Sequence, residues 1–452
     1  MSSPHTINGY RSVGYFGSWR AVGDAPVTLK RLFVDSPMGE HLTHLNYSFG
    51  NIAGPQEALD AAREHGTQGL DGVQPYTAFL SNHFDPHGGN ADIAGNATPD
   101  FLHLFSADQS VSGVADTAQQ PLAGCLHQLR LVKERFPHLR VILSLGGWAW
   151  SRNFSPAVAT PERRTALVDS LIHLWIEGNL PRIDGRGGEG AAAGIFDGFD
   201  LDWEWPGAAP ELQMPGNAVD PEHDRENFLA FARLLRRRLD EWGAQHGRTL
   251  EISAFLPANA EVAKAGGWNT PEMFECLDFG NLQGYDLRGP WDTTPGHQGN
   301  LYADPNPEHG GGRAIERVVA AYTSAGVSPA QLNLGHACYG YGWRGSAPQP
   351  WGVVEGPATQ ADGTAALGWD QLKARGLDVV HHTVDGAFNA TSGYDAADRE
   401  WWTFDDPTAV TEKTRWALAQ GLGGVDYWEV GSDADAQLVA AGAAALREQA
   451  RG

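Results

Sequence analysis

Short runs of hydrophobic residues recur along the chain, separated by longer stretches of mixed polarity. Eight of these runs predict buried strands, because several are rich in Val, Ile, Leu or aromatic residues. They are residues 13–16, 45–49, 141–145, 199–203, 251–254, 281–285, 332–338 and 424–428.

Helical patterns fill the stretches between these runs. In residues 123–136, Leu126, Leu129 and Val132 recur at helical spacing. A capping residue followed by proline is a common helix start, and it occurs at Thr160-Pro161, Thr270-Pro271 and Asp406-Pro407. Further helices are expected over residues 224–245, 313–324 and 434–448, and Gly421 is expected to end the helix that starts after Asp406.

This alternation predicts an α/β fold, a (β/α)8 TIM barrel over residues 10–449. Such barrels need roughly 250 residues, whereas the chain has 452, so large insertions are expected. One spans residues 50–122, between the second and third strands. The other, residues 344–403, lies between the seventh strand and its helix and is long enough for a small subdomain beside the carboxyl face of the barrel.

Composition narrows the possible partners. The chain has 32 basic and 55 acidic residues, a net charge of −23, which argues against binding to nucleic acid phosphates. Its 16 tryptophans suit the stacking of flat, neutral rings such as sugars, although most should fill the core.

No apolar run is long enough to cross a membrane. Residues 1–10 lack the pattern of a signal peptide, so the sequence leaves open whether the protein stays inside the cell.

The segment 197–206, DGFDLDWEWP, carries the clearest chemical signal. On a strand, alternate side chains share a face, so Asp200, Asp202 and Glu204 should point into the barrel. Mutual repulsion raises the pKa of crowded carboxyls, which suits the last acid of the row to general acid catalysis. Two alternatives remain at this point: an antiparallel strand with its acids in solvent, and a site for Mg²⁺ or Ca²⁺.

Together with other motifs, this segment resembles the chitinases of glycoside hydrolase family 18, of the bacterial type with a chitin-insertion domain. Asp197, Asp200, Asp202 and Glu204 match the DxxDxDxE motif of the family, and residues 144–148, SLGGW, match its SxGG motif. Residues 13–19, 42–52, 284–292 and 421–429 resemble the first, second, sixth and eighth strands of these enzymes. The insertion at 344–403 lies where many members carry the chitin-insertion domain, so the resemblance implies a small α+β insertion subdomain between the seventh strand and its helix.

The resemblance implies hydrolysis of β-1,4 bonds between N-acetylglucosamine units, with neither a metal nor a cofactor. The substrate itself would supply the nucleophile. Glu204 would be the acid and base, and Asp202 would hold the acetamide N–H. Asp200 would share a proton with Asp202, with Ser144 and Tyr15 in support. The resemblance also implies that Tyr285 contacts the acetamide oxygen, with Asp286 beside it.

The resemblance also assigns aromatic residues to sugar subsites. Trp428 would lie under the −1 sugar, Trp148 and Trp291 on the leaving side, and Trp19 and Phe49 on the opposite side. The chain departs from the common family pattern at Gln283-Gly284, Tyr339-Gly340-Tyr341 and Asp426. Of these, Gln283 is expected near Asp202 or Glu204, where it would alter their pKa values.

The sequence therefore predicts a chitinase that acts on chitin or chitooligosaccharides as a monomer, endo- or exo-acting, without nucleic acid or membrane partners. By resemblance it would be secreted. The alternatives are an endo-β-N-acetylglucosaminidase acting on N-glycans, a chitin-binding lectin, and a metal-dependent hydrolase.

His381-His382 and the pair His83 and His87 have no partners that suggest a metal site, and the three cysteines are too far apart in sequence for a zinc ribbon.

Overall fold

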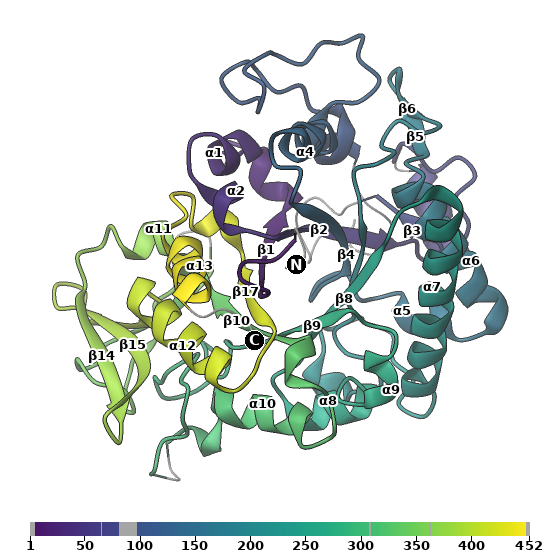
Figure 1. Ribbon diagram of the computed structural model, residues 1–452. Coiled ribbons are helices and arrows are strands. Elements are labelled where there is room, and N and C mark those ends of the chain that lie inside the picture. Colours follow the sequence, from purple (N-terminus) through teal and green to yellow (C-terminus); the bar gives the residue numbers. More distant parts are fainter. Residues whose placement is uncertain (1–4, 65, 81–96, 307–308, 361–362, 449–452) are drawn as a thin grey trace.

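The computed structural model describes residues 5–64, 66–80, 97–306, 309–360 and 363–448. Eight parallel strands form a barrel, which is closed because β1 pairs with both β17 and β2 (Figure 1). All eight predicted strands are present, in the predicted order. They are β1 Arg11–Gly17, β2 His44–Ile52, β4 Arg140–Gly146, β7 Gly198–Asp202, β8 Glu251–Leu256, β9 Phe279–Leu282, β10 Leu332–Ala337 and β17 Gly424–Trp428.

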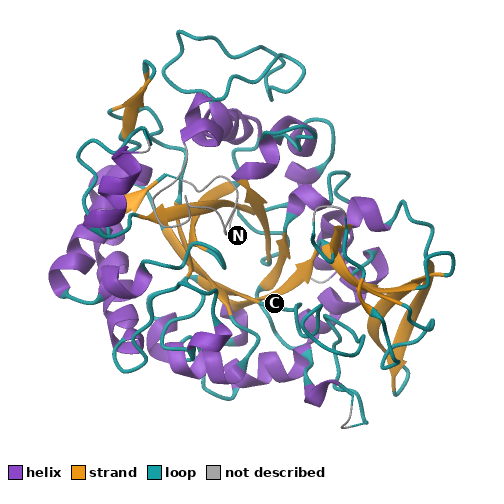
Figure 2. Cartoon of the chain, turned by 180° about the vertical axis from the view of Figure 1, so that it is seen from behind, coloured by secondary structure: helices purple, strands orange, loops and turns teal. Residues whose placement is uncertain are grey.

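Helices surround the barrel (Figure 2). The outward side chains of the strands pack against them, and the core contains Phe199, Leu201 and Trp203 of the β7 segment, as their alternation predicts. The helices are α1 Leu29–Phe33, α2 Met38–His41, α3 Gln56–Glu64, α4 Gly124–Arg135, α5 Phe154–Val158, α6 Pro161–Leu171, α7 Asp224–His246, α8 Ala260–Gly266, α9 Pro271–Phe274, α10 Ile315–Thr323, α11 Trp369–Leu372, α12 Pro407–Ala419 and α13 Gln437–Glu448.

Two of the three predicted proline starts are capped as expected. The side chain of Thr160 accepts the N–H of Arg163 at the start of α6, and Asp406 accepts that of Ala409 at the start of α12. The expected cap at Thr270 is wrong. Its hydroxyl donates to the carbonyl of Gly267 instead, and α9 has only four residues.

The last helix starts three residues later than predicted. The Asp433 carboxylate accepts the backbone N–H groups of Gln437, Leu438 and Val439, at 2.8, 2.9 and 3.1 Å. These are the orphan donors of the first turn, so the helix begins where the carboxylate can reach them.

The second insertion forms a separate antiparallel sheet in the order β12-β11-β16-β15-β14, with β13 on β11. It lies to one side of the barrel, with β14 and β15 outermost (Figure 1). Its first strand begins at Tyr339, directly after β10, and its last ends at Phe404, just before α12. The strands are β11 Tyr339–Arg344, β12 Gly356–Pro357, β13 Ala366–Gly368, β14 Asp378–Val384, β15 Ala387–Asp395 and β16 Glu400–Phe404.

Smaller elements complete the described chain. In the first insertion, β3 Ala78–Phe79 pairs antiparallel with β2. Between η3 Ile172–Ile176 and β7, the strands β5 Leu180–Ile183 and β6 Arg186–Gly188 pair with each other. The other one-turn helices are η1 Ser18–Ala21, η2 Thr98–Leu102, η4 Pro210–Leu212, η5 Gly310–Gly312, η6 Pro329–Gln331 and η7 Val430–Ser432. Cys125, Cys276 and Cys338 are buried as free thiols. Within the described residues, every helix is too short or too polar to span a membrane.

Candidate active site

The acidic row lies at the carboxyl end of β7. Asp200 and Asp202 are strand residues, and Glu204 follows two positions later; their exposed fractions are 0, 3 and 8%. Trp203 points the other way and stacks on Phe154 with ring centroids 5.1 Å apart. The alternation therefore turns the three carboxyls into the barrel, and the interpretation of solvent-exposed acids is wrong.

Asp200 is the most strongly hydrogen-bonded acid of the row. Ser144 Oγ on β4 donates to its Oδ2 at 2.8 Å, and Ser253 Oγ on β8 donates to its Oδ1 at 2.6 Å. Tyr15 also donates to this carboxylate, while its own oxygen accepts from Asn281 at 2.8 Å. Burial raises the pKa of Asp200 to about 6, although these donors oppose the shift.

The carboxyl groups of Asp202 and Glu204 share a hydrogen bond. Burial raises the pKa of Asp202 well above its usual value, and the charges of Glu204 and Asp200 raise it further. Burial also raises the pKa of Glu204 to about 8, opposed by its hydrogen bond to Asp202 and reinforced by the charge of Asp286. A carboxyl with this pKa keeps its proton at neutral pH, as a general acid must.

Tyr285 and Asp286 lie just beyond β9 and close to the acidic row. Tyr285 is 3% exposed and packs edge-on against Tyr339, with ring centroids 6.1 Å apart. Tyr339 Oη donates to Asp286 Oδ1 at 2.5 Å. Since Tyr339 begins β11, the first strand of the inserted sheet supplies part of the site.

The expected placement of Gln283 beside Asp202 or Glu204 is wrong. Its Oε1 accepts the N–H of Ala258 at 3.2 Å, and its Nε2 lies 3.5 Å from Asp286 Oδ2. Its amide therefore bonds Ala258, just beyond β8, and Asp286, and its described hydrogen bonds include neither Asp202 nor Glu204.

An aromatic cluster lies around the end of β17. The ring of Trp428 stacks on Phe49 with centroids 5.5 Å apart, lies 6.5 Å from Trp19, and meets Tyr15 edge-on at 5.7 Å. Trp150 joins this cluster at 5.6 Å from Phe49. Trp150 was not predicted from the sequence as a site residue, although it lies only two positions after Trp148, which was.

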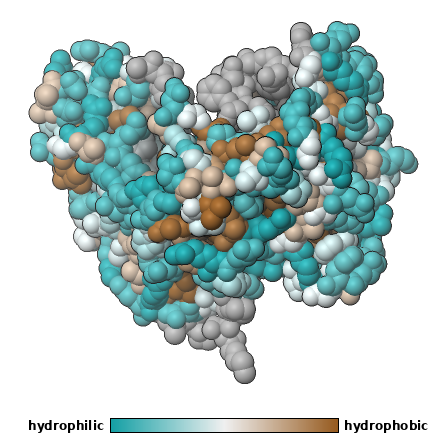
Figure 3. Space-filling model, turned by 90° about the horizontal axis from the view of Figure 1, so that it is seen from above, coloured by the Kyte–Doolittle hydropathy of each residue, from teal (hydrophilic) through white to brown (hydrophobic). Residues whose placement is uncertain are grey.

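Trp148 and Trp291 are large aromatic residues that the fold leaves uncovered. Their exposed fractions are 46 and 59%, whereas the core of this protein covers most of its other large hydrophobic side chains. The ring of Trp291 rests edge-on against Tyr341, 5.5 Å away. In the space-filling view, apolar residues gather near the middle of the face that is shown (Figure 3).

Asp197, the first acid of the sequence motif, is not at the site. It precedes β7, at the opposite end of the strand from Glu204. Its carboxylate binds Lys133 Nζ at 2.7 Å, Arg248 at 3.1 Å and the N–H of Val141 at 3.0 Å. We therefore assign Asp197 a structural role at the base of the barrel.

The histidines discussed above have other partners. His381 Nε2 lies 2.8 Å from Asp406, and His382 Nε2 lies 2.7 Å from Ser392 Oγ. His83 and His87 lie outside the described residues. Across the described ranges, no group of three or more His, Cys, Asp or Glu side chains could hold a metal ion.

Asp426 adds a buried acid beneath Trp428. It lies on β17, in register with Val13 and Gly335, and both of its oxygens are buried without a hydrogen-bond partner in the described structure. A side chain at Gly335 would come within 3.0 Å of both Asp426 and the Tyr285 ring, so this glycine makes room for them. Burial, with repulsion from Asp200, raises the pKa of Asp426 well above its usual value.

We expect Asp426→Asn to raise the melting temperature, and by more at about pH 8 than at about pH 5. An unfolded Asp has a pKa of about 3.9, so above that pH the native state binds one more proton and loses stability as pH rises. Asn cannot ionise and removes this loss. Calorimetry at both pH values is the measurement, with the exposed Asp24→Asn as control. An equal gain at both pH values would contradict a raised pKa for the buried Asp426 carboxyl in the folded protein.

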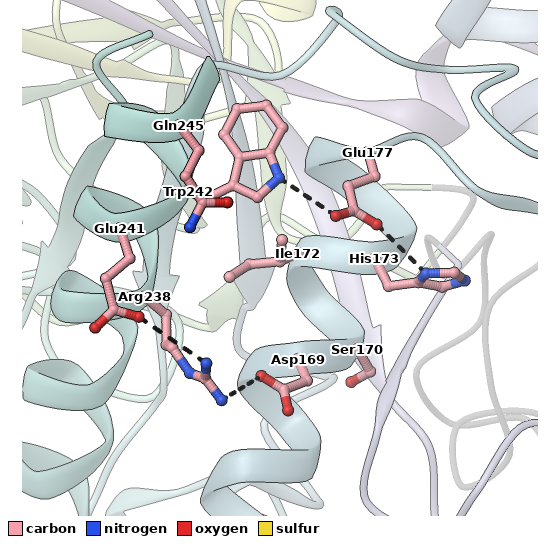
Figure 4. A pocket seen from close by; sticks show the side chains of 9 residues that line it. All are labelled: Asp169, Ser170, Ile172, His173, Glu177, Arg238, Glu241, Trp242 and Gln245. Carbon is pink, nitrogen blue, oxygen red and sulfur yellow. Dashed lines mark hydrogen bonds and ion pairs between the residues drawn. The ribbon is translucent and has the colours of Figure 1, made fainter. Parts of the chain in front are cut away.

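A groove of about 560 Å³ between α6, η3 and α7 contains none of the predicted site residues (Figure 4). Its polar side chains pair with one another. Arg238 binds Asp169 at 3.2 Å, and Trp242 Nε1 donates to Glu177 at 3.3 Å. The acidic row, not this groove, is the candidate active site.

Comparison with known proteins agrees with this geometry. Residues 11–433 match the family model described as glycosyl hydrolases family 18. The chain belongs to this family. It is similar to chitinase C of Streptomyces lividans (30% identity over 93% of the chain) and to chitinase 63 of Streptomyces plicatus (31% over 95%). The chain spans 57 and 59% of the lengths of these two relatives.

A solved structure extends the family likeness to nearly the whole chain. The catalytic domain of psychrophilic chitinase B from Arthrobacter TAD20 is 42% identical, with a TM-score of 0.88, over 99% of this chain and 98% of that one. The (β/α)8 fold and the family 18 resemblance predicted from the sequence are both confirmed.

Proposed function

We propose that this family 18 protein is a chitinase that cleaves β-1,4 bonds between N-acetylglucosamine units, with Glu204 as acid and base. The observation that carries the proposal is the buried row of Asp200, Asp202 and Glu204, whose last member has a pKa raised to about 8. The chain is similar to proteins that are named chitinases, which supports the choice of substrate.

The proposed reaction begins with proton transfer from Glu204 to the glycosidic oxygen. The carbonyl oxygen of the 2-acetamido group attacks C1 of the same sugar as the bond to the leaving sugar breaks, which gives an oxazolinium ion. Glu204, now ionised, takes a proton from water, and the oxygen of that water adds to C1 and opens the ring with net retention. An intramolecular nucleophile held in place has a large rate advantage over one from solution.

Asp202 and Tyr285 would orient the acetamide in this scheme. The buried Oδ1 of Asp202 has no partner among the described residues and can accept the acetamide N–H. Burial raises the pKa of Tyr285, so its hydroxyl stays protonated and can donate to the acetamide oxygen. Asp200, which accepts hydrogen bonds from Ser144 and Tyr15, would share a proton with Asp202.

Product analysis on a chitin hexamer and on an N-glycan, run side by side, tests the substrate. We expect short N-acetylglucosamine oligomers from the hexamer and no cleavage of the glycan. Cleavage of the glycan core alone would identify an endo-β-N-acetylglucosaminidase instead. Tight binding with no products from either substrate would indicate a lectin, and activity lost to EDTA and restored by a divalent cation would indicate a metal-dependent hydrolase.

The exposed tryptophans would bind sugars on the leaving side. We expect Trp148→Ala and Trp291→Ala each to reduce degradation of chitin about tenfold, because a stacking contact is worth about 1–1.5 kcal/mol. Hydrolysis of a short substrate with an aryl leaving group should change much less, since it barely occupies these subsites. Initial rates on both substrates are the measurement.

Trp242→Ala is the matched control for these two variants, because Trp242 lies in the remote groove between η3 and α7. Equal losses on polymer and aryl substrate for Trp148→Ala and Trp291→Ala would remove both residues from the proposed subsites.

We also propose that the protein acts as a secreted monomer. Secretion is supported because solid chitin is too large to enter a cell. Light scattering of the purified protein and fractionation of the producing cells test the two parts. A stable dimer or activity confined to the cytoplasm would contradict them.

A further inference from the structure

The loop after β4 faces in two directions. Trp148 projects from it and is 46% exposed, while Ser151, three residues later, is completely buried. No motif used in the sequence analysis includes Ser151.

The buried hydroxyl of Ser151 lies between two peptide groups of the acidic segment. Its Oγ accepts the backbone N–H of Glu204 at 2.9 Å. The same Oγ donates towards the carbonyl of Gly147 at 2.9 Å and lies 3.2 Å from that of Asp202. Ser151 therefore contacts the main chain on both sides of Trp203.

Close backbone packing strengthens this connection. The N–H of Gly147 donates to the carbonyl of Asp202 at 2.7 Å. A Cβ at Gly146, where φ is +108°, would come within 2.3 Å of the same carbonyl oxygen. Only a glycine lets the β4 loop lie this close to the acidic segment.

The other flank of Glu204 is also held by a side chain. Asn217 Nδ2 donates to the carbonyl of Glu204 at 3.1 Å. The Trp203 ring is packed between Phe154 and Phe228, with centroids 5.1 and 5.3 Å away. The main chain of Glu204 is thus fixed on each side, while its carboxyl stays beside Asp202.

We propose that Ser151 is a positioning residue that sets the place of the Glu204 carboxyl for proton donation to the leaving group. This inference rests on the proposed function. Removing the hydroxyl leaves the N–H of Glu204 unpaired and weakens the connection between the acidic segment and the β4 loop, which then rests on the bond from Gly147 to Asp202. A displacement of about 1 Å at a reacting group can cost about 100-fold in rate.

The test compares Ser151→Ala with wild type on two substrates. One is chitotetraose, whose sugar leaving group needs protonation; the other is a 4-nitrophenyl chitobioside, whose phenolate leaves with little help. We expect kcat on chitotetraose to fall about 10- to 100-fold with KM changed less than about twofold. On the aryl substrate we expect a loss of less than about threefold.

A loss of similar size on both substrates would overturn the proposal, because general disruption of the site does not depend on the leaving group. Ser346→Ala is the control: Ser346 is a buried serine of the inserted sheet region whose Oγ bonds the carbonyls of Trp343 and Arg399. It should change neither rate.

Asn217→Ala provides a second variant if Ser151→Ala does not fold. We expect the same selective loss on chitotetraose, because Asn217 holds the peptide group on the other side of Glu204. An unselective loss in this variant as well would overturn the proposal. Failure of wild type to cleave either substrate would instead reject the proposed chitinase activity.

Discussion

Glu204→Gln is expected to lose about 10²- to 10⁴-fold in kcat on chitooligosaccharides while still binding them. The amide has the size of the carboxyl but cannot donate a proton to the glycosidic oxygen or take one from water. The pKa of Glu204 is raised to about 8, chiefly by burial, so the wild-type rate should also fall as pH rises through that value. Initial rates and calorimetric binding to a chitin hexamer are the measurements.

The exposed Glu211→Gln on η4 is the matched control and should behave as wild type. Near-normal turnover by a correctly folded Glu204→Gln would reject Glu204 as the acid. Loss of binding together with turnover would mean that the change disrupts the structure of the site rather than the chemistry.

The second large effect concerns the substrate. A fully deacetylated chitosan is expected to bind at best and not to be cleaved, whereas chitin of the same length is degraded. The reason is that Asp202 and Tyr285 are proposed to hold the acetamide, whose carbonyl oxygen is the proposed nucleophile and is missing from the deacetylated sugar. Mass spectrometry of the products from both polymers measures this difference.

Anomer analysis tests the same mechanism independently. NMR of fresh products from chitin oligomers should show the β-anomer first, because two displacements at C1 retain its configuration. An initial α-anomer would indicate direct attack by water, with Asp202 or Asp200 as base. Rapid cleavage of the deacetylated polymer would contradict an acetamide nucleophile even with β-products.

The order of strands and helices could be predicted because local patterns encode it. Each barrel strand is a short hydrophobic run, and burial on both faces of a parallel sheet requires such runs. Asp406-Pro407 and Thr160-Pro161 marked helix starts correctly, since a cap needs only the next few backbone N–H groups. Thr270-Pro271 also precedes a helix, α9, but the Thr270 hydroxyl donates to the carbonyl of Gly267 and does not cap that helix.

The motif showed which acids share a face but not what each one contacts. The period of two places Asp200, Asp202 and Glu204 together, because alternate residues of a strand point the same way. Asp197 lies at the other end of the strand, where Lys133 and Arg248 bind it. The motif therefore contains both residues proposed to act in catalysis and residues that stabilise the fold, and it does not distinguish between them.

The sequence by itself determined the barrel, the inward-facing acids and the family resemblance, because these follow from local periodicity and short motifs. Only the tertiary structure decided the neighbours of those acids. Closure of the barrel brings Tyr15 of β1 to Asp200 of β7, and the inserted sheet delivers Tyr339 to Asp286. Ser151 reaches the backbone of Glu204 from 53 residues away. Such contacts depend on the packing of distant segments, and no local pattern specifies that packing.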